Sequence, residues 1–483
     1  MKSDRKRYGI PNALFTLSEQ AKGYPALTYL ALLMLGGISG YLIIVTTNFL
    51  SEAQLSQITN TYMGTRLRHL QRAIQAINGQ EFTPISTHQP AYYYYLALLN
   101  KVLHKAEPWQ LLLWMQMAAS WIVLTAYPAI LYRLTKSLFV AVLTPVFIYV
   151  FLGRYLFLVK TDLYWGYAWA VSLGVPLLAI LASERWSKNS WYFYTALCCI
   201  ISASNVLRTQ VALPITILLL GIVTFKLFVK WERDCKKITC ASQIAIFLKR
   251  NIPLLIALII LFTSQGFLAR TVPSIILPSF IGKGDRGITQ GPWHSAYIGL
   301  GWKENKYGIT YKDECAIAKA LELKPGVKYL SEEYMAILKA EYFTILTEDP
   351  AFVAKLYWQK FAKNMSLCFK YFKRVSKRGA TFVGIMLFLI IVERRLRPKT
   401  TRYSLSNGIH KVLTSPPVLM FPFALFCVFA NMTTAMIAVP RNNYLIGSYT
   451  ACGMLVFTIV VLLTLYTTNI FGQRIKACQG SNN

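Results

Sequence analysis

Long apolar runs recur along this chain, and they constrain its fold more than any other feature. A run of about 20 apolar residues can cross the hydrocarbon core of a bilayer as an α-helix. Helices are the expected spanning elements because they satisfy their own backbone hydrogen bonds where water is absent. The apolar runs cover 24–50, 107–132, 137–153, 163–183, 190–207, 209–229, 251–269, 379–392, 412–439 and 444–470. They predict an all-α, polytopic transmembrane helix bundle with about ten or more spanning helices.

Composition favours a membrane protein over a soluble one. Hydrophobic residues make up 55% of the 483 positions and charged residues 15%, whereas soluble domains carry about 25% charged residues. The chain starts with the basic segment MKSDRKRYGI, and the following apolar run extends to Leu50. That run is too long for the core of a signal peptide, so we expect it to be the first spanning helix.

The net charge is strongly positive, with 51 Lys and Arg against 20 Asp and Glu. These cations gather at the ends of the apolar runs, where Lys and Arg set membrane topology and contact anionic lipid. We therefore expect membrane lipids as partners and no nucleic acid. The nine cysteines show neither metal-ligand spacing nor the pattern of a disulfide framework.

The positive-inside rule gives the predicted bundle a direction. If the basic N-terminus is cytoplasmic, the basic loops 226–250 and 393–411 and the C-terminus fall on the same side. Segments 51–106 and 270–378 then face outward, as expected for a protein of the bacterial inner membrane. The predicted domains are a transmembrane module with amphipathic helices in its first outer loop (1–269), a mainly helical extracytoplasmic domain (270–378) and C-terminal spanning helices (379–483).

Two helix starts are predicted within the outer domain. Ser331, followed by Glu332 and Glu333, has the pattern of an N-cap with acidic residues in the first turn. Asp349-Pro350 begins a second helix, which carries several large apolar residues. We expect this helix to lie against the membrane.

Acidic residues on the outer side are scarce enough to name individually. In the first 269 residues only Glu52, Glu81, Glu107 and Asp162 fall there. Glu52 follows the first apolar run and Asp162 precedes the fourth, so both lie at outer ends of predicted helices. Two such carboxylates can converge for general-base catalysis or cation binding. The alternative is that each is simply solvated.

An aromatic helix start is predicted at His88-Gln89-Pro90, because proline is favoured in the first turn of a helix. The sequence that follows, AYYYYLALLNKVLH, is typical of an amphipathic helix at a membrane interface. Its four tyrosines have a second interpretation as an aromatic belt at headgroup level. His88 at the helix start is a candidate anion ligand.

Three further residues are candidates for binding a substrate. Arg208 interrupts an apolar stretch at the outer surface, where it is either a snorkelling anchor or a phosphate ligand. Lys160 lies in an outer loop near a predicted helix end. His294, in GPWHSAYIGLGW, is a catalytic residue, a ligand or a structural histidine. The chain contains no P-loop, Rossmann fingerprint, HExxH or GxSxG motif, which leaves cytosolic nucleotide chemistry without support.

Taken in order, these motifs resemble the GT-C superfamily of membrane glycosyltransferases. Ser51-Glu52 stands where many members have two acids, and His88-Gln89-Pro90 stands where relatives of lipid A aminoarabinose transferase and of protein mannosyltransferases have His/Lys-Pro-Pro. The similarity continues in AYYYYLALLNKVLH, in Lys160-Thr161-Asp162, in Arg208 and in WHSAYIGLGWKENKYGITYKDE. Ser51 and Gln89 depart from the family pattern.

The resemblance implies an inverting transfer of a sugar from a polyprenyl-phosphate carrier to a lipid, glycan or protein at the extracytoplasmic face. Glu52 would act as base or orient the acceptor, and Asp162 would support it or hold a divalent cation. His88, Lys160, Arg208 and His294 would bind the substrate. GT-C members differ in their use of a metal, so a cation is a candidate cofactor only.

Two other classes of protein stay open. A transporter or lipid flippase would place ionisable residues near the membrane midplane and show repeated halves, and the sequence shows no repeat. A noncatalytic assembly protein with a GT-C-like shell is the second alternative, and the Ser51 and Gln89 departures keep it open.

Overall fold

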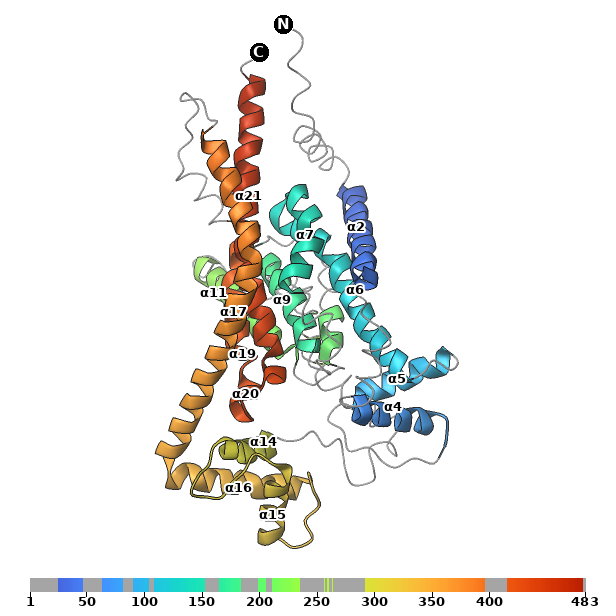
Figure 1. The fold of residues 1–483 in the computed structure, drawn as a ribbon, viewed down its shortest axis with the longest axis vertical. Helices are drawn as coiled ribbons and strands as arrows, with labels where there is room; N and C mark the ends of the chain where they lie inside the picture. The colour runs from blue at the N-terminus through green and yellow to red at the C-terminus, as the bar shows by residue number, and fades with distance from the viewer. Residues whose placement is uncertain are drawn as a thin grey trace.

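The computed structural model describes most of the chain as helix. The described residues are 25–46, 63–80, 90–103, 108–152, 165–183, 199–205, 211–234, 292–395 and 415–480, together with the single positions 256, 259 and 263. Within these ranges there are helices, turns and short connections but no β-strand. The predicted all-α class is therefore confirmed (Figure 1).

Several helices are long and apolar enough to cross a membrane, which indicates a membrane protein. Among the described residues there are five: Ala26–Ile44, Gln110–Thr135, Trp165–Ser183, Pro416–Ile437 and Asn442–Thr467. Two shorter apolar helices cover Leu138–Phe151 and Leu213–Ile222. The predicted segment 251–269 lies almost wholly outside the described residues, as does much of 190–207. The count of about ten spans therefore stays a prediction.

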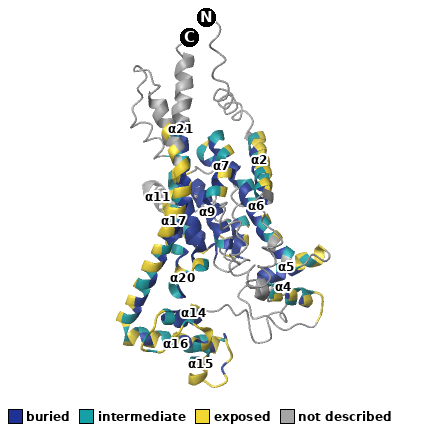
Figure 2. Ribbon diagram, viewed as in Figure 1, coloured by how far each residue is buried: buried dark blue, intermediate teal, exposed yellow. Residues whose placement is uncertain are grey.

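The bundle is built from helices far apart in the sequence. Its elements are α2 (Pro25–Thr46), α6 (Pro108–Thr135), α7 (Leu138–Phe151), α9 (Trp165–Ser183), α11 (Leu213–Asp234), η7 (Pro416–Leu419), α19 (Met420–Ala430), α20 (Thr433–Ile437), η8 (Asn442–Leu445) and α21 (Ile446–Gly480). The middle of α9 is buried on all sides, whereas α2 exposes leucines along its outer face (Figure 2). A helix that is apolar all round is expected at the centre of such a bundle.

The contacts between helices fix their directions. Helix α2 is antiparallel to α6, because Tyr29 packs edge-to-face against Tyr132 while Gly36 lies against Leu124. Helix α7 is antiparallel to α21, because Gly453 lies against Phe151 and Phe147 contacts Phe457. The beginning of α2 and the end of α21 consequently lie at the same end of the molecule (Figure 1).

A small helical domain lies at the opposite end (Figure 1). It consists of α14 (Pro292–Gly299), η5 (Leu300–Trp302), α15 (Asp313–Leu323) and α16 (Glu332–Glu348) around its own apolar core. The predicted N-cap is confirmed, because the Ser331 hydroxyl accepts a hydrogen bond of 3.1 Å from the Tyr334 backbone N–H.

The small domain is joined to the bundle by one continuous helix, α17 (Pro350–Arg395). Its start at Pro350 is the predicted one. The helix has 46 residues and so extends about 69 Å at 1.5 Å per residue. It runs parallel to α21, with the Tyr371 ring against that of Tyr449 and Gly379 against Val456. The domain boundary predicted between 378 and 379 therefore falls inside a single helix.

Candidate functional site

Five of the six predicted site residues lie outside the described residues. They are Glu52, His88, Lys160, Asp162 and Arg208, and their roles stay predictions. The elements that precede or follow two of them are described. Helix α2 ends at Thr46, before Glu52, and α5 (Pro90–Val102) begins directly after His88-Gln89. The predicted helix start at Pro90 is thus confirmed.

Helix α5 packs against an amphipathic helix, α4 (Met63–Ile77), near the same end of the bundle as the small domain (Figure 1). The apolar face of α4 presents Leu70 and Ala73 to the tyrosines of α5. Of these tyrosines, Tyr92, Tyr93 and Tyr94 are at most 4% exposed. An aromatic belt facing headgroups needs exposed rings. Three of the four tyrosines are instead buried, and Tyr92 and Tyr93 belong to the apolar core that α5 shares with α4.

His294 is the predicted site residue that the structure describes. It lies on α14 with 1% of its surface exposed. Its Nε2 is 3.1 Å from Oδ1 of Asp313, and its Nδ1 is 2.8 Å from the Tyr334 hydroxyl. A carboxylate only accepts hydrogen bonds, so Nε2 donates to Asp313.

The Tyr334 hydroxyl keeps its proton, because burial raises its pKa. It can therefore donate a hydrogen bond to Nδ1 of the His294 ring. Both ring nitrogens then have partners that join α14, α15 and α16. This is the arrangement of a structural histidine, and no ring nitrogen is left to meet a substrate. The substrate-binding role of His294 stays a prediction without a geometric argument in its favour.

Sequence reasoning missed a buried lysine where the small domain meets the bundle. Lys360 on α17 has no exposed surface. Its Nζ donates to the carbonyl oxygens of Met436 at 3.1 Å, Ile437 at 3.4 Å and Ala438 at 2.7 Å. These carbonyls end α20, and the last carbonyls of a helix carry partial negative charge. The amine therefore caps α20 from a different helix.

Gly299 and Asn364 also pack closely against α20 beside Lys360. A Cβ built on Gly299, the last residue of α14, would lie 2.2 Å from the Ile437 carbonyl oxygen, so only glycine allows this approach. Asn364, one helical turn after Lys360, is fully buried and lies 3.5 Å from the Met436 sulfur through its Nδ2. The three elements α14, α17 and α20 thus meet at one point. The sequence signal was a Lys and an Asn on the core-facing side of an amphipathic helix.

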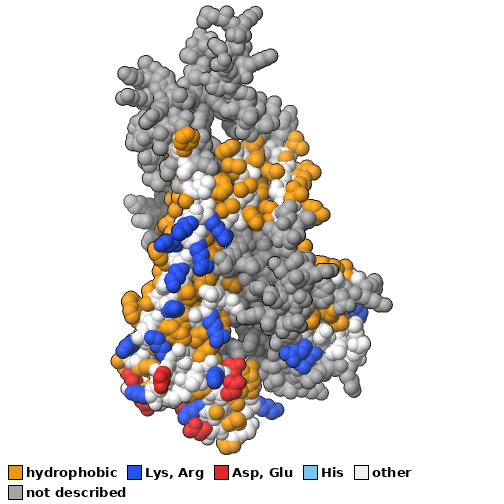
Figure 3. Space-filling model, in the orientation of Figure 1, with side chains coloured by type: hydrophobic (Ala, Val, Ile, Leu, Met, Phe, Trp, Pro, Cys, Tyr) orange, Lys and Arg blue, Asp and Glu red, His pale blue; other side chains and the backbone are white. Residues whose placement is uncertain are grey.

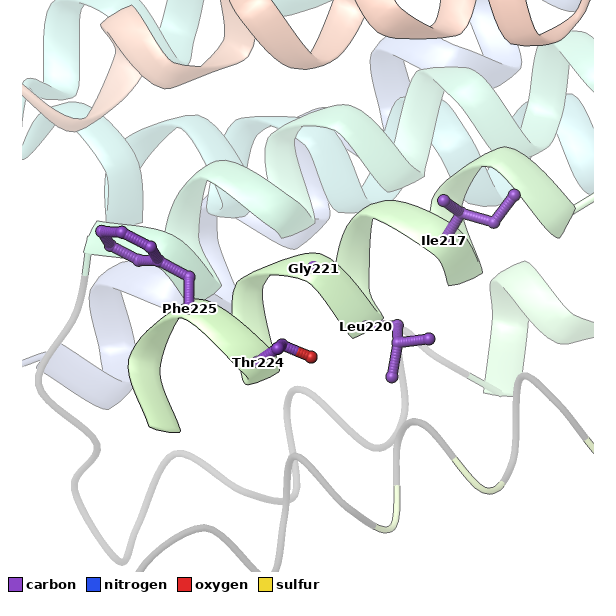
Figure 4. A pocket seen from close by; sticks show the side chains of 5 residues that line it. All are labelled: Ile217, Leu220, Gly221, Thr224 and Phe225. Atoms are coloured by element: carbon purple, nitrogen blue, oxygen red, sulfur yellow. The ribbon is translucent and has the colours of Figure 1, made fainter. Parts of the chain in front are cut away.

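Two other features of the described residues do not form a reaction site. An apolar groove on α11 is lined by Ile217, Leu220, Gly221, Thr224 and Phe225, which come from one helix and include no acid or base (Figure 4). Within the described ranges, no group of three His, Cys, Asp or Glu side chains is arranged to hold a metal ion. The candidate cation thus depends on Glu52 and Asp162, outside those ranges.

Comparison of the chain with protein-family models, with curated proteins and with solved structures finds no match.

Proposed function

We propose that this chain is a multi-pass membrane glycosyltransferase of GT-C type, which moves a sugar from a polyprenyl-phosphate carrier to an acceptor at the extracytoplasmic face. The observation that carries the proposal is the order and direction of the elements. An apolar first helix is followed by an amphipathic α4–α5 unit at the end of the bundle that bears the small domain. Of the residues that the resemblance assigns to the site, Glu52 follows α2 in the sequence and His88 precedes α5. Lys160 and Asp162 precede α9.

The proposed reaction needs one base and a set of cations. The acceptor hydroxyl oxygen attacks the anomeric carbon while its proton passes to Glu52. The bond between the anomeric carbon and the phosphate oxygen breaks, and the polyprenyl phosphate leaves with the electron pair. His88, Lys160 and Arg208 stabilise the charge that grows on that phosphate, because oriented donors act most strongly where charge develops. Asp162 supports the base or holds a cation.

The test replaces single carboxylates in the cell that makes the protein. Glu52→Ala and Asp162→Ala are each expected to lower the amount of the dependent surface glycan by at least about 100-fold, the usual contribution of a general base. Glu81→Ala is the matched control, because Glu81 is an acid in the same outer loop as Glu52 without a proposed role. Immunoblotting of the membrane fraction checks that every variant is expressed.

The outcomes separate the three classes of protein. Unchanged glycan in both variants would exclude the proposed chemistry and leave the noncatalytic assembly protein. If the protein is a transporter or flippase, an inactive variant would instead leave the lipid-linked sugar on the cytoplasmic side of the membrane. Lipid-linked sugar accumulating at the outer face of the Glu52→Ala cells would support the transferase.

A further inference from the structure

One face of α17 carries a dense set of exposed cations. Lys363, Lys370, Lys373, Arg374, Lys377 and Arg378 are all exposed, and in Figure 3 Lys and Arg side chains gather along α17 above the small domain. We call these six residues the basic face. Because a helix repeats every 3.6 residues, the four lysines project away from the buried residues Asn364, Cys368 and Val375. Arg374 and Arg378 flank that buried line on one side. The face extends about 22 Å along the helix axis.

Nothing in the described part of the chain neutralises the basic face. From Pro350 to Val392, α17 contains eight Lys and Arg and no Asp or Glu. Among the described residues, no acid forms an ion pair with any of the six side chains. By contrast, the exposed Lys306 and Lys324 of the small domain pair with Asp349 and Glu333. Six unpaired like charges on one surface repel each other, and an anionic partner would relieve that repulsion.

The basic face ends where α17 becomes apolar. Residues 379–392 contain no charged side chain, and these 14 positions extend only about 21 Å, less than the core of about 30 Å. A short apolar run is accommodated when flanking Lys and Arg side chains snorkel to the interface. Lys373, Arg374, Lys377 and Arg378 are the flanking cations on the side of the small domain. This spacing brings them to the phosphates of the headgroup layer.

The position of the basic face also argues against the usual role of Lys and Arg in setting membrane topology. On the proposed topology, the basic face lies on the same side as the small domain, outside the cell. The positive-inside rule disfavours Lys and Arg next to a span on that side. Phe369, 66% exposed next to Lys370, adds an exposed apolar ring to the same stretch of α17. A lipid surface is the partner that fits both features.

We propose that the basic face of α17 binds the headgroups of anionic phospholipids in the leaflet next to the small domain. The proposal requires α17 to enter a membrane but does not require glycosyl transfer. Its failure is therefore distinguishable from failure of the proposed function.

The test measures which lipids the full-length protein retains. The protein is reconstituted in nanodiscs that contain phosphatidylcholine and phosphatidylglycerol in equal amounts, and retained lipids are counted by native mass spectrometry. The parent protein is expected to retain phosphatidylglycerol in preference to phosphatidylcholine. The variant K373Q/R374Q/K377Q/R378Q is expected to lose that preference by about tenfold or more, because each cation near an anionic surface attracts it independently.

The matched control removes the same charge elsewhere. K303Q/K312Q/K328Q/K355Q changes four exposed lysines away from the membrane-proximal part of α17 and is expected to keep the lipid preference. An equal loss in both variants would show a net-charge effect and would overturn the proposal. A parent protein that retains both lipids equally would also overturn the proposal. This second measurement does not depend on whether the variant folds.

Discussion

At the scale of single residues, Lys360 shows the largest departure from what a lysine normally does. Burial lowers its pKa to about 7, while the unfolded chain keeps the amine charged up to about pH 10.4. Within the described residues, three carbonyl oxygens and the Tyr357 ring, 5.0 Å away, face Nζ, and no acid pairs with it. The folded state therefore binds fewer protons than the unfolded state between these two values.

The stability that depends on Lys360 should rise with pH. Below about pH 7 the folded protein holds a charged amine away from water, and this cost falls as the amine becomes neutral. Between pH 7 and about pH 9 the parent should gain about 2 kcal/mol relative to Lys360→Met, up to 1.4 kcal/mol per pH unit. Thermal unfolding in detergent across this range is the measurement. Lys355→Met, which changes an exposed lysine of the same helix, should show no such trend.

From the sequence, a local hydrogen bond could be predicted more readily than the burial of a side chain. The cap at Ser331 was predictable because it depends on neighbours three residues away. Lys360 was not, because it is one of ten cations in α17 and its partners lie more than 70 residues later. For His294 the sequence leaves a catalytic residue, a ligand and a structural histidine open, and only the positions of Asp313 and Tyr334 favour the structural role.

At the scale of elements, α2 and α6 make a close backbone contact. A Cβ built on Gly36 would lie 2.6 Å from the Leu124 carbonyl oxygen, whereas one on Gly37 would lie 3.5 Å from the Trp121 ring. Gly36→Ala must separate the two backbones and is expected to cost about 2 kcal/mol, as other overpacked sites do. Gly37→Ala meets ordinary contact distances and should be neutral or slightly stabilising. Thermal unfolding in detergent would compare them, and equal effects would contradict this packing.

Helix starts were more predictable than helix lengths. Pro90, Ser331 and Pro350 carry local signals, and the structure begins helices there. The length of α17 was missed because the hydropathy pattern changes at Gly379, where cations give way to apolar residues. Lys and Arg are good helix formers, so the backbone continues through that change. Composition shows where a helix passes into different surroundings, but it does not show where the helix ends.

At the scale of the whole molecule, the packing of the helices decides which elements share an end. Packing contacts, independent of the charges, put the beginning of α2 and the end of α21 at one end and the small domain at the other. The positive-inside rule predicts that the termini share a side opposite 270–378, and the orientation of that side in a membrane stays a prediction. The number of spans and the position of Glu52 relative to Asp162 are decided by segments outside the described residues.

This arrangement predicts which parts of the chain are accessible from outside the cell. One variant carries an epitope tag between Pro325 and Gly326, an exposed turn where Gly326 has a φ of +80°; another carries the tag after Asn483. Antibody should label the first in intact spheroplasts, whereas the second should need permeabilised membranes, because charged tags do not cross a bilayer unaided. Permeabilised cells control for expression of both. Labelling of the two tags from the same side would contradict the topology, and with it the assignment of Glu52, His88, Asp162 and Arg208 to one surface.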